Sequence, residues 1–287
     1  IEWLFDSGAL DGRFRAEGLQ LHDFVEEGVE GGLDLREGVI SGTVEKPVLE
    51  ASLALDDLIA QEIRFESGSG RAKLDGRTIY LSDARVQMGS GTLRLDGQYG
   101  IEEGRGEVRG TLEGLPLDRI QPLLPDETVV QGSLDGQFVA NLDEKRLSGA
   151  EVEGKVNRLE VNGAFFGSGP IKAAKEGDDW RGDLTIGQPE RYFEAANVRY
   201  RPETRELEAS ISALDLPVRN LFFAARPYLV EARTRSGESP TGADWIQTLD
   251  GVQGRLDVAA DVSGKIDDLS IDVQTLLLRE TSLHGDE

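Results

Sequence analysis

Residues 71–100 read RAKLDGRTIYLSDARVQMGSGTLRLDGQYG, and apolar side chains recur in this stretch at every second position. The residues from Ala84 to Met88, for example, alternate between apolar and polar side chains. A period of two is the side-chain period of a β-strand. Asp75-Gly76 and the Gly-Ser-Gly at 89–91 interrupt the alternation with residues that tolerate a positive φ in tight turns. Connections this short join antiparallel neighbours, so the stretch predicts consecutive strands of one antiparallel sheet.

The same alternation covers most of the chain and returns near its end as GRLDVAADVSGKIDDLSIDVQ at 254–274. Leu-Asp-Gly recurs at irregular intervals, which disfavours a solenoid of fixed period. Two interruptions have helical spacing, near 115–125 and within 216–249, and each begins with a Leu-Pro pair. Proline suits the first turn of a helix. We therefore expect an all-β chain with one or two short helical inserts.

Composition excludes several classes of partner and site. The 287 residues carry 31 Lys and Arg against 54 Asp and Glu, a formal charge of −23, so phosphate backbones would repel the surface and we expect no nucleic-acid partner. The chain has no cysteine, which rules out disulfides and thiolate sites. No stretch approaches the ~20 apolar residues of a membrane-spanning helix. The chain opens on IEWLFDSG without a methionine, and we expect a segment of a longer protein whose anchor lies elsewhere.

No group of residues in the sequence has the pattern of a catalytic or cofactor site. His22 and His284 lie almost a whole chain apart, which disfavours a metal site. The glycine-rich stretches that begin at Gly68, Gly89 and Gly104 lack the spacing of a dinucleotide fingerprint, and we interpret them as turn glycines. Acidic pairs such as Asp56-Asp57 are interpreted as strand ends and turns. The sequence thus predicts no enzyme, no cofactor and no metal.

An amphipathic sheet must bury its apolar face against something. A second sheet would give a sandwich or barrel, which is the default for an alternating sequence. A bound lipid could also cover the apolar face, because the inward positions are mostly Leu, Val, Ile and Ala with few large aromatic residues. A two-chain phospholipid has about thirty methylenes, each stabilised by ~0.8 kcal/mol when it leaves water.

Several phrases of the sequence resemble the TamB and AsmA-like family of bacterial envelope proteins. They are SGTVEKPVLEASLAL, DGRTIYLSDARVQMGSGTLRLDG, LPLDRIQPLLPDETVVQGSLDGQF and VSGKIDDLSIDVQ, in an order that runs from about Gly38 to Val273. The resemblance implies an elongated, curled antiparallel β-sheet that forms an open groove with an apolar interior, often called a β-taco. On this basis we expect residues 1–287 to form one β-groove segment of a longer protein.

The resemblance also implies a function and a location. Such proteins are anchored in the inner membrane, cross the periplasm of diderm bacteria and carry phospholipid toward the outer membrane, which supports outer-membrane assembly. The expected partners are phospholipid, the inner membrane through an anchor outside this segment, and an Omp85-type outer-membrane barrel through the parent protein. The alternative is a structural or interaction β-sandwich or solenoid module of an envelope protein with no lipid cargo.

The residues expected to line the groove are those that alternate inward. They are Leu74, Val86, Met88, Leu93, Leu95, Val108, Leu112, Phe138, Val152, Leu256, Val258 and Val262.

Overall fold

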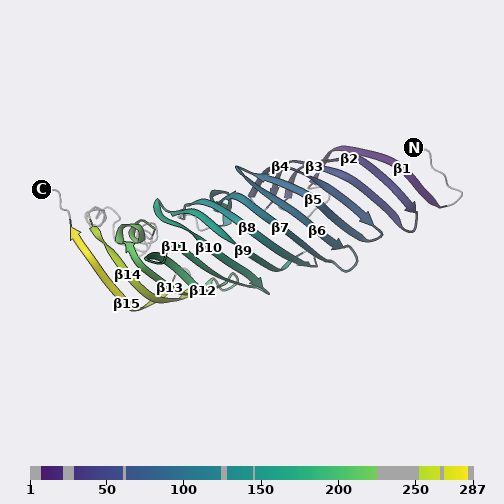
Figure 1. Cartoon of the computed structure of the whole chain (residues 1–287). Coiled ribbons are helices and arrows are strands. Elements are labelled where there is room, and N and C mark those ends of the chain that lie inside the picture. Colours follow the sequence, from purple (N-terminus) through teal and green to yellow (C-terminus); the bar gives the residue numbers. More distant parts are fainter. Residues whose placement is uncertain are drawn as a thin grey trace, which may run out of the picture. The chain divides into compact units, whose positions relative to one another are not determined.

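A computed structural model describes residues 8–21, 29–60, 63–123, 128–144, 146–224, 252–265 and 268–283. Fifteen strands dominate these residues, and they follow one another across the sheet in chain order (Figure 1). The strands are β1 Ala9–Gln20, β2 Val29–Thr43, β3 Pro47–Ala60, β4 Ile63–Asp75, β5 Thr78–Met88, β6 Gly91–Gly100, β7 Arg105–Pro116, β8 Val130–Asp143, β9 Arg146–Val161, β10 Ala164–Glu176, β11 Asp179–Gln188, β12 Arg191–Arg201, β13 Glu206–Pro217, β14 Val252–Lys265 and β15 Asp268–Leu283. The prediction of an all-β chain built on an antiparallel, unclosed sheet is confirmed, since β1 and β15 are the two ends of the sheet order.

Close packing divides the chain into two compact units. Unit 1 contains Ile1–Pro122 and Asp135–Val152, and unit 2 contains Leu123–Leu134 and Glu153–Glu287. Antiparallel registers join β1 through β7 in unit 1 and β10 through β15 in unit 2. Within each unit, the extensive backbone contacts between described elements are those between strands that are neighbours in the sheet order.

Cross-strand register sorts the side chains of unit 1 onto two different faces, because directly paired residues point to the same side of a sheet. One row of paired residues is apolar across seven strands: Leu19, Leu33, Leu55, Gly68, Val86, Leu93 and Leu112. The adjacent row is largely polar: Asp34, Ala54, Ser69, Arg85, Arg94 and Thr111. Unit 2 repeats the apolar row as Ile171, Leu184, Ala195, Ile211, Ala260 and Val273. We call the side of each unit that carries such rows its apolar face, and the other side its polar face.

Capped bulges interrupt the strands at residues with a left-handed backbone. At each of these residues the N–H donates to a side chain of the neighbouring strand. The pairs are Gly18 with Asp34 (2.9 Å), Asp83 with Asp96 (3.0 Å), Gly114 with Asp135 (2.6 Å), Arg158 with Ser168 (2.9 Å), Asn197 with Asp183 (2.8 Å) and Asp215 with Asp257 (2.8 Å). The hydrogen bond from Gly18, helped by Arg36, lowers the pKa of the Asp34 carboxyl.

Each bulge lets a strand bend without turning its apolar residues outward. In β5 the register shifts between Leu81 and Ala84, around Asp83, and the two flanking residues stay on the apolar face although they are three positions apart. In β13 the shift falls between Ala213 and Leu216, around Asp215. An added residue bends the strand and increases its twist. The bulges therefore supply curvature, while the apolar rows remain intact.

Two interpretations drawn from the sequence are wrong. Asp56 and Asp57 lie inside β3, where Asp57 has a φ of 50°, a conformation that aspartate tolerates better than most residues. Gly68 lies inside β4 on the apolar face, and a Cβ atom there would lie 3.0 Å from Cδ1 of Leu55. Both positions belong to strands because pairing with the neighbouring strands overrides the local turn preference.

Both predicted inserts contain a helix that follows a Leu-Pro pair. The first is a 3₁₀ helix, η2, Leu117–Leu123, and the second is an α-helix over 218–224; the rest of the predicted insert, from 225 to 249, lies outside the described residues. Before each helix stand a left-handed residue, a buried leucine and a proline: Gly114-Leu115-Pro116 and Asp215-Leu216-Pro217. Because proline cannot donate to a strand ladder, it ends the strand at the same point in both cases.

Removing the cap of the bulge in β13 should loosen it locally. Asp257, which is 9% exposed, accepts the N–H of Asp215 and also pairs with Arg279, so Asp257→Ala leaves a partly buried donor without its acceptor. We expect a loss of about 1–3 kcal/mol. Faster amide exchange in residues 213–217, measured by mass spectrometry, is the expected readout. Asp11→Ala, an exposed residue of β1, is the control, and equal exchange in both variants would contradict a stabilising role for the cap.

Candidate functional site

The apolar face is the candidate site, and the structure places the predicted lining residues on it. Cross-strand register puts those of β4 to β7 and of β14 on this face. Phe138 is on the same face, since its ring approaches Gly110, and Val152 shares its alternation in β9 with buried Val156. Val86, Met88, Leu112, Leu256 and Val262 are buried, and the other predicted residues are half-buried. Their contact with lipid stays a prediction.

Aromatic rings on the apolar face of unit 1 cover glycines of neighbouring strands. A Cβ atom at Gly38 would lie 2.6 Å from the ring of Phe14, and one at Gly106 would lie 2.8 Å from the ring of Tyr99. The ring of Phe138 similarly lies 3.0 Å from the Cβ position of Gly110. A ring that occupies the space of a missing side chain adds apolar area close to the backbone. These large residues therefore widen the apolar surface.

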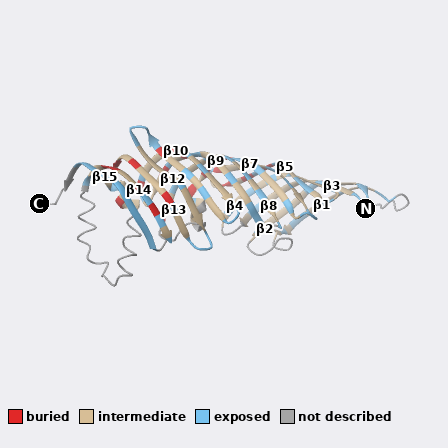
Figure 2. Cartoon of the chain, turned by 90° about the horizontal axis from the view of Figure 1, so that it is seen from below, coloured by how far each residue is buried: buried red, intermediate tan, exposed pale blue. Residues whose placement is uncertain are grey.

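Burial along this face falls from one end of β5 to the other, whereas Ala209 of β13 and Val262 of β14 stay buried toward the end opposite the helix at 218–224. We call the end that carries η2 or the helix at 218–224 the helical end of its unit, and the opposite end the distal end. In β5 the exposed fraction is 3% at Met88 and 7% at Val86 near the helical end, and 40% at Ile79 near the distal end. Ile186, at the helical end of β11, has an exposed fraction of 0%. Buried residues accordingly form short patches along the strands (Figure 2).

Polar contacts hold the helices to the turns at the helical ends. In unit 1 the carboxylate of Glu66 accepts the N–H of Gly89, in the β5–β6 turn, at 2.7 Å and pairs with Arg119 of η2 at 2.8 Å. The hydrogen bond from Gly89, with a smaller effect from Arg119, lowers the pKa of Glu66. In unit 2 the side-chain amide of Asn162 donates to the carbonyl of Ala224 at 2.8 Å. Each helix is thus fixed at one end of the apolar face.

The distal end of unit 2 carries a cross-strand row of a different character. Lys175 of β10 pairs with Trp180 of β11, Trp180 pairs with Tyr200 of β12, and Tyr200 pairs with Leu207 of β13. All three polar-tipped residues are half-buried. Sequence analysis missed this row because its members come from three strands, and only the register brings them together.

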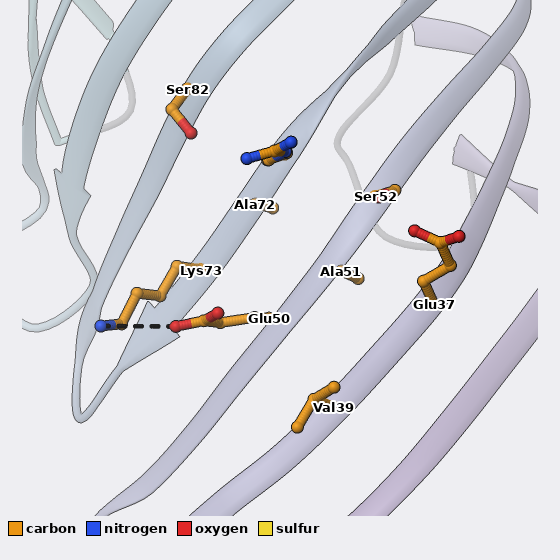
Figure 3. Close-up of a pocket in the computed structure, with 9 residues that line it drawn as sticks. Glu37, Val39, Glu50, Ala51, Ser52, Ala72, Lys73 and Ser82 are labelled. Atoms are coloured by element: carbon orange, nitrogen blue, oxygen red, sulfur yellow. Dashed lines mark ion pairs between the residues drawn. The ribbon is translucent and has the colours of Figure 1, made fainter.

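A shallow depression of about 390 Å³ lies on the polar face of unit 1 (Figure 3). Its lining includes Glu37, Ser52 and the ion pair between Lys73 and Glu50, whose atoms Nζ and Oε1 are 3.5 Å apart. The carboxylate of Asp75, followed by that of Glu50, raises the pKa of Lys73. A raised pKa keeps the amine protonated, which is the opposite of what a lysine base or nucleophile needs. We therefore interpret the depression as a gap between charged side chains.

Two further properties of the described residues concern metal ions and membrane-spanning helices. Within the described ranges, no group of three or more His, Asp and Glu side chains is arranged to hold a metal ion. His22 and His284 lie outside those ranges. No helix of the described chain combines the length and the apolar content that crossing a membrane requires.

Comparison with known proteins found no matching family model, no matching curated protein and no matching solved structure.

The burial gradient predicts that a charge will be tolerated at one end of a strand and not at the other. Val86→Asp places a carboxylate at a 7% exposed position and should destabilise the protein by about 3 kcal/mol or more. Ile79→Asp, on the same face of the same strand but 40% exposed, should cost about 1 kcal/mol or less. Urea denaturation measures both. Equal losses would mean that the apolar face is uniformly buried.

The contact between Glu66 and Gly89 should titrate. Because the pKa of Glu66 is lowered from 4.5 in the folded chain, the stabilisation is complete above 4.5 and is lost as the pH falls through the lower folded value. The amide resonance of Gly89, followed by NMR from neutral to acidic pH, should therefore shift with a midpoint below 4.5. Glu66→Gln should abolish this transition. A midpoint at or above 4.5 in the unaltered protein would contradict the assignment.

Proposed function

We propose that the apolar face binds the acyl chains of phospholipids and that this chain is a section of a hydrophobic groove that carries them. The observation that carries the proposal is an apolar face that runs strand after strand in an unclosed sheet and whose leucines are in many places only half-buried. In a sandwich, a facing sheet would bury such rows along their whole length. Half-buried leucines such as Leu74, Leu93 and Leu95 are available to a ligand instead.

Dimensions support an acyl chain as the ligand. The part of β5 between its distal end and the bulge, Thr78–Ser82, is roughly 16 Å long at about 3.3 Å per residue. Half of a ~30 Å bilayer core, the depth of one leaflet, is about 15 Å. The more exposed part of the strand therefore matches the length of one acyl chain in a membrane. Each methylene that leaves water there contributes ~0.8 kcal/mol.

The charge pattern supports a passive conduit in an aqueous compartment. Charged and polar residues occupy the polar face, and many form surface ion pairs such as Arg94 with Glu113 and Lys172 with Glu153. Such pairs add little stability but keep the surface hydrated. Together with the resemblance to the TamB and AsmA-like proteins, this favours a periplasmic groove between the inner and outer membranes of a diderm bacterium. Through its parent protein the segment would reach an inner-membrane anchor and an Omp85-type barrel.

A structural module without cargo is the second candidate, and one observation favours it. At the helical ends the protein itself fills the apolar face, as the complete burial of Ile186 and the 3% exposure of Met88 illustrate. If this packing continued across the face in solution, no ligand would be needed.

Lipid content distinguishes the two candidates. Native mass spectrometry of the protein purified in mild detergent should detect bound phospholipid, and Leu95→Asp should lower its occupancy severalfold, because a carboxylate on the apolar face is costly beside hydrocarbon. Gln98→Asp, on the polar face of the same strand, is the matched control and should retain lipid. Repeated absence of lipid from the unaltered, folded protein would favour the structural module.

A further inference from the structure

The further inference concerns the orientation of a bound lipid on the apolar face of unit 2, and it rests on the proposed function. A phospholipid has an apolar end and a charged end, so a face that binds it in one orientation must itself differ between its two ends. In unit 2 the two ends of the strands carry different side chains on the apolar face.

The helical end of unit 2 is apolar and tightly packed. Ile186 of β11 pairs with Phe193 of β12, and Phe193 packs edge-on against Phe166 with ring centroids 5.6 Å apart. Ile186 is fully buried, and Leu216 is 3% exposed. The helix at 218–224 is fixed at this end of the strands through Asn162. A charged headgroup placed among these packed side chains would lose its water.

The distal end has the residues that membrane proteins place at the level of lipid headgroups. Trp180 and Tyr200 each combine an apolar ring with a polar tip, which suits a boundary between hydrocarbon and water. Lys175 pairs with Trp180 on the same face and brings a cation to this end, where its ammonium group donates to the carbonyl of Gly177. A lysine can lay its alkyl stem along an apolar surface while its ammonium group stays in water.

Charges on the polar face at this end are already matched to one another. Asp179 pairs with Arg199 and Arg201, and Arg199 lowers the pKa of its carboxyl. Arg201 also pairs with Glu206 at 3.0 Å and with Glu208 at 3.2 Å. This network ties the β10–β11 turn to the β12–β13 turn beneath the row, so the positions of Trp180 and Tyr200 relative to each other are fixed.

We propose that the row Lys175, Trp180 and Tyr200 is a headgroup site for phospholipid: the phosphate lies near Lys175, the glycerol region lies against Trp180 and Tyr200, and the acyl chains extend along the apolar face toward Phe193. The acyl ends meet the packed helical end, and the headgroup remains in water at the distal end. The occupant is thus a phosphate-bearing lipid held in one orientation.

Quenching by brominated lipid tests the orientation. In a Trp3→Phe, Trp245→Phe background, Trp180 is the one tryptophan of the chain, since the sequence has three. Micelles of detergent and phosphatidylglycerol are prepared with bromine either near the carbonyl end or near the methyl end of the acyl chains. We expect Trp180 to be quenched at least twofold more strongly by bromine near the carbonyl end, because bromine quenches on close approach.

A second tryptophan position provides the matched control. Trp180→Phe combined with Phe193→Trp moves the fluorophore to the helical end of the same apolar face, on the strand that neighbours β11. There we expect the order to reverse, with stronger quenching by bromine near the methyl end. The same order at both positions would overturn the orientation while leaving lipid binding intact. No quenching at either position by either lipid would overturn the proposed function as well.

The role of Lys175 is tested by comparing two lipids with identical acyl chains. Lys175→Gln should weaken binding of phosphatidylglycerol by roughly two- to fivefold, the range of a partly exposed ion pair, and should leave binding of diacylglycerol unchanged. Lys172→Gln, on the polar face of the same strand, should alter neither. An equal effect of Lys175→Gln on both lipids would show that this residue supports the fold and does not contact phosphate.

Discussion

The structure depends on a hydrogen bond that recurs from strand to strand, in which a side-chain oxygen accepts the N–H of a left-handed residue in the neighbouring strand. A residue that leaves the strand ladder at a bulge has an N–H without a backbone acceptor. Leaving that N–H unsatisfied would lower the stability of the folded chain. Asp96 and Asp257 supply that acceptor in different units with nearly the same geometry, 3.0 and 2.8 Å. With the donor satisfied, a strand bends while its apolar side chains stay on one face. Curvature and amphipathicity, which would otherwise conflict, are thereby made compatible.

Much of this architecture could be predicted from the sequence, and the part that could not has a definite cause. Alternation within a strand, as from Ala84 to Met88, is local, and it predicted strands and faces correctly. The residue that accepts the N–H of a bulge is distant in the sequence. Asp96 and Asp83 are thirteen positions apart, and Asp257 and Asp215 are forty-two positions apart. Asp57 and Gly68 were misread for the same reason, because only pairing distinguishes a mid-strand aspartate or glycine from one in a turn. The row of Lys175, Trp180 and Tyr200 likewise exists only through the register.

The apolar face combines two properties that a uniform core would not have. At the helical end it resembles a protein interior, with Ile186 completely enclosed and Met88 nearly so. Toward the distal end of β5 the exposed fraction rises to 40% at Ile79, and the ring of Tyr99 in the neighbouring strand lies over glycine backbone. Packing at the helical end fixes the strands in place, and their distal parts extend from there.

The connectivity of the sheet also bears on how such a chain can change in evolution. Each strand is joined to the next in the sheet order, and the extensive contacts within a unit link sequential neighbours. Duplication or loss of one hairpin would therefore alter the number of strands and leave the pairing of the remaining strands unchanged. In such a protein, selection can change the number of strands one hairpin at a time without changing the length of each strand.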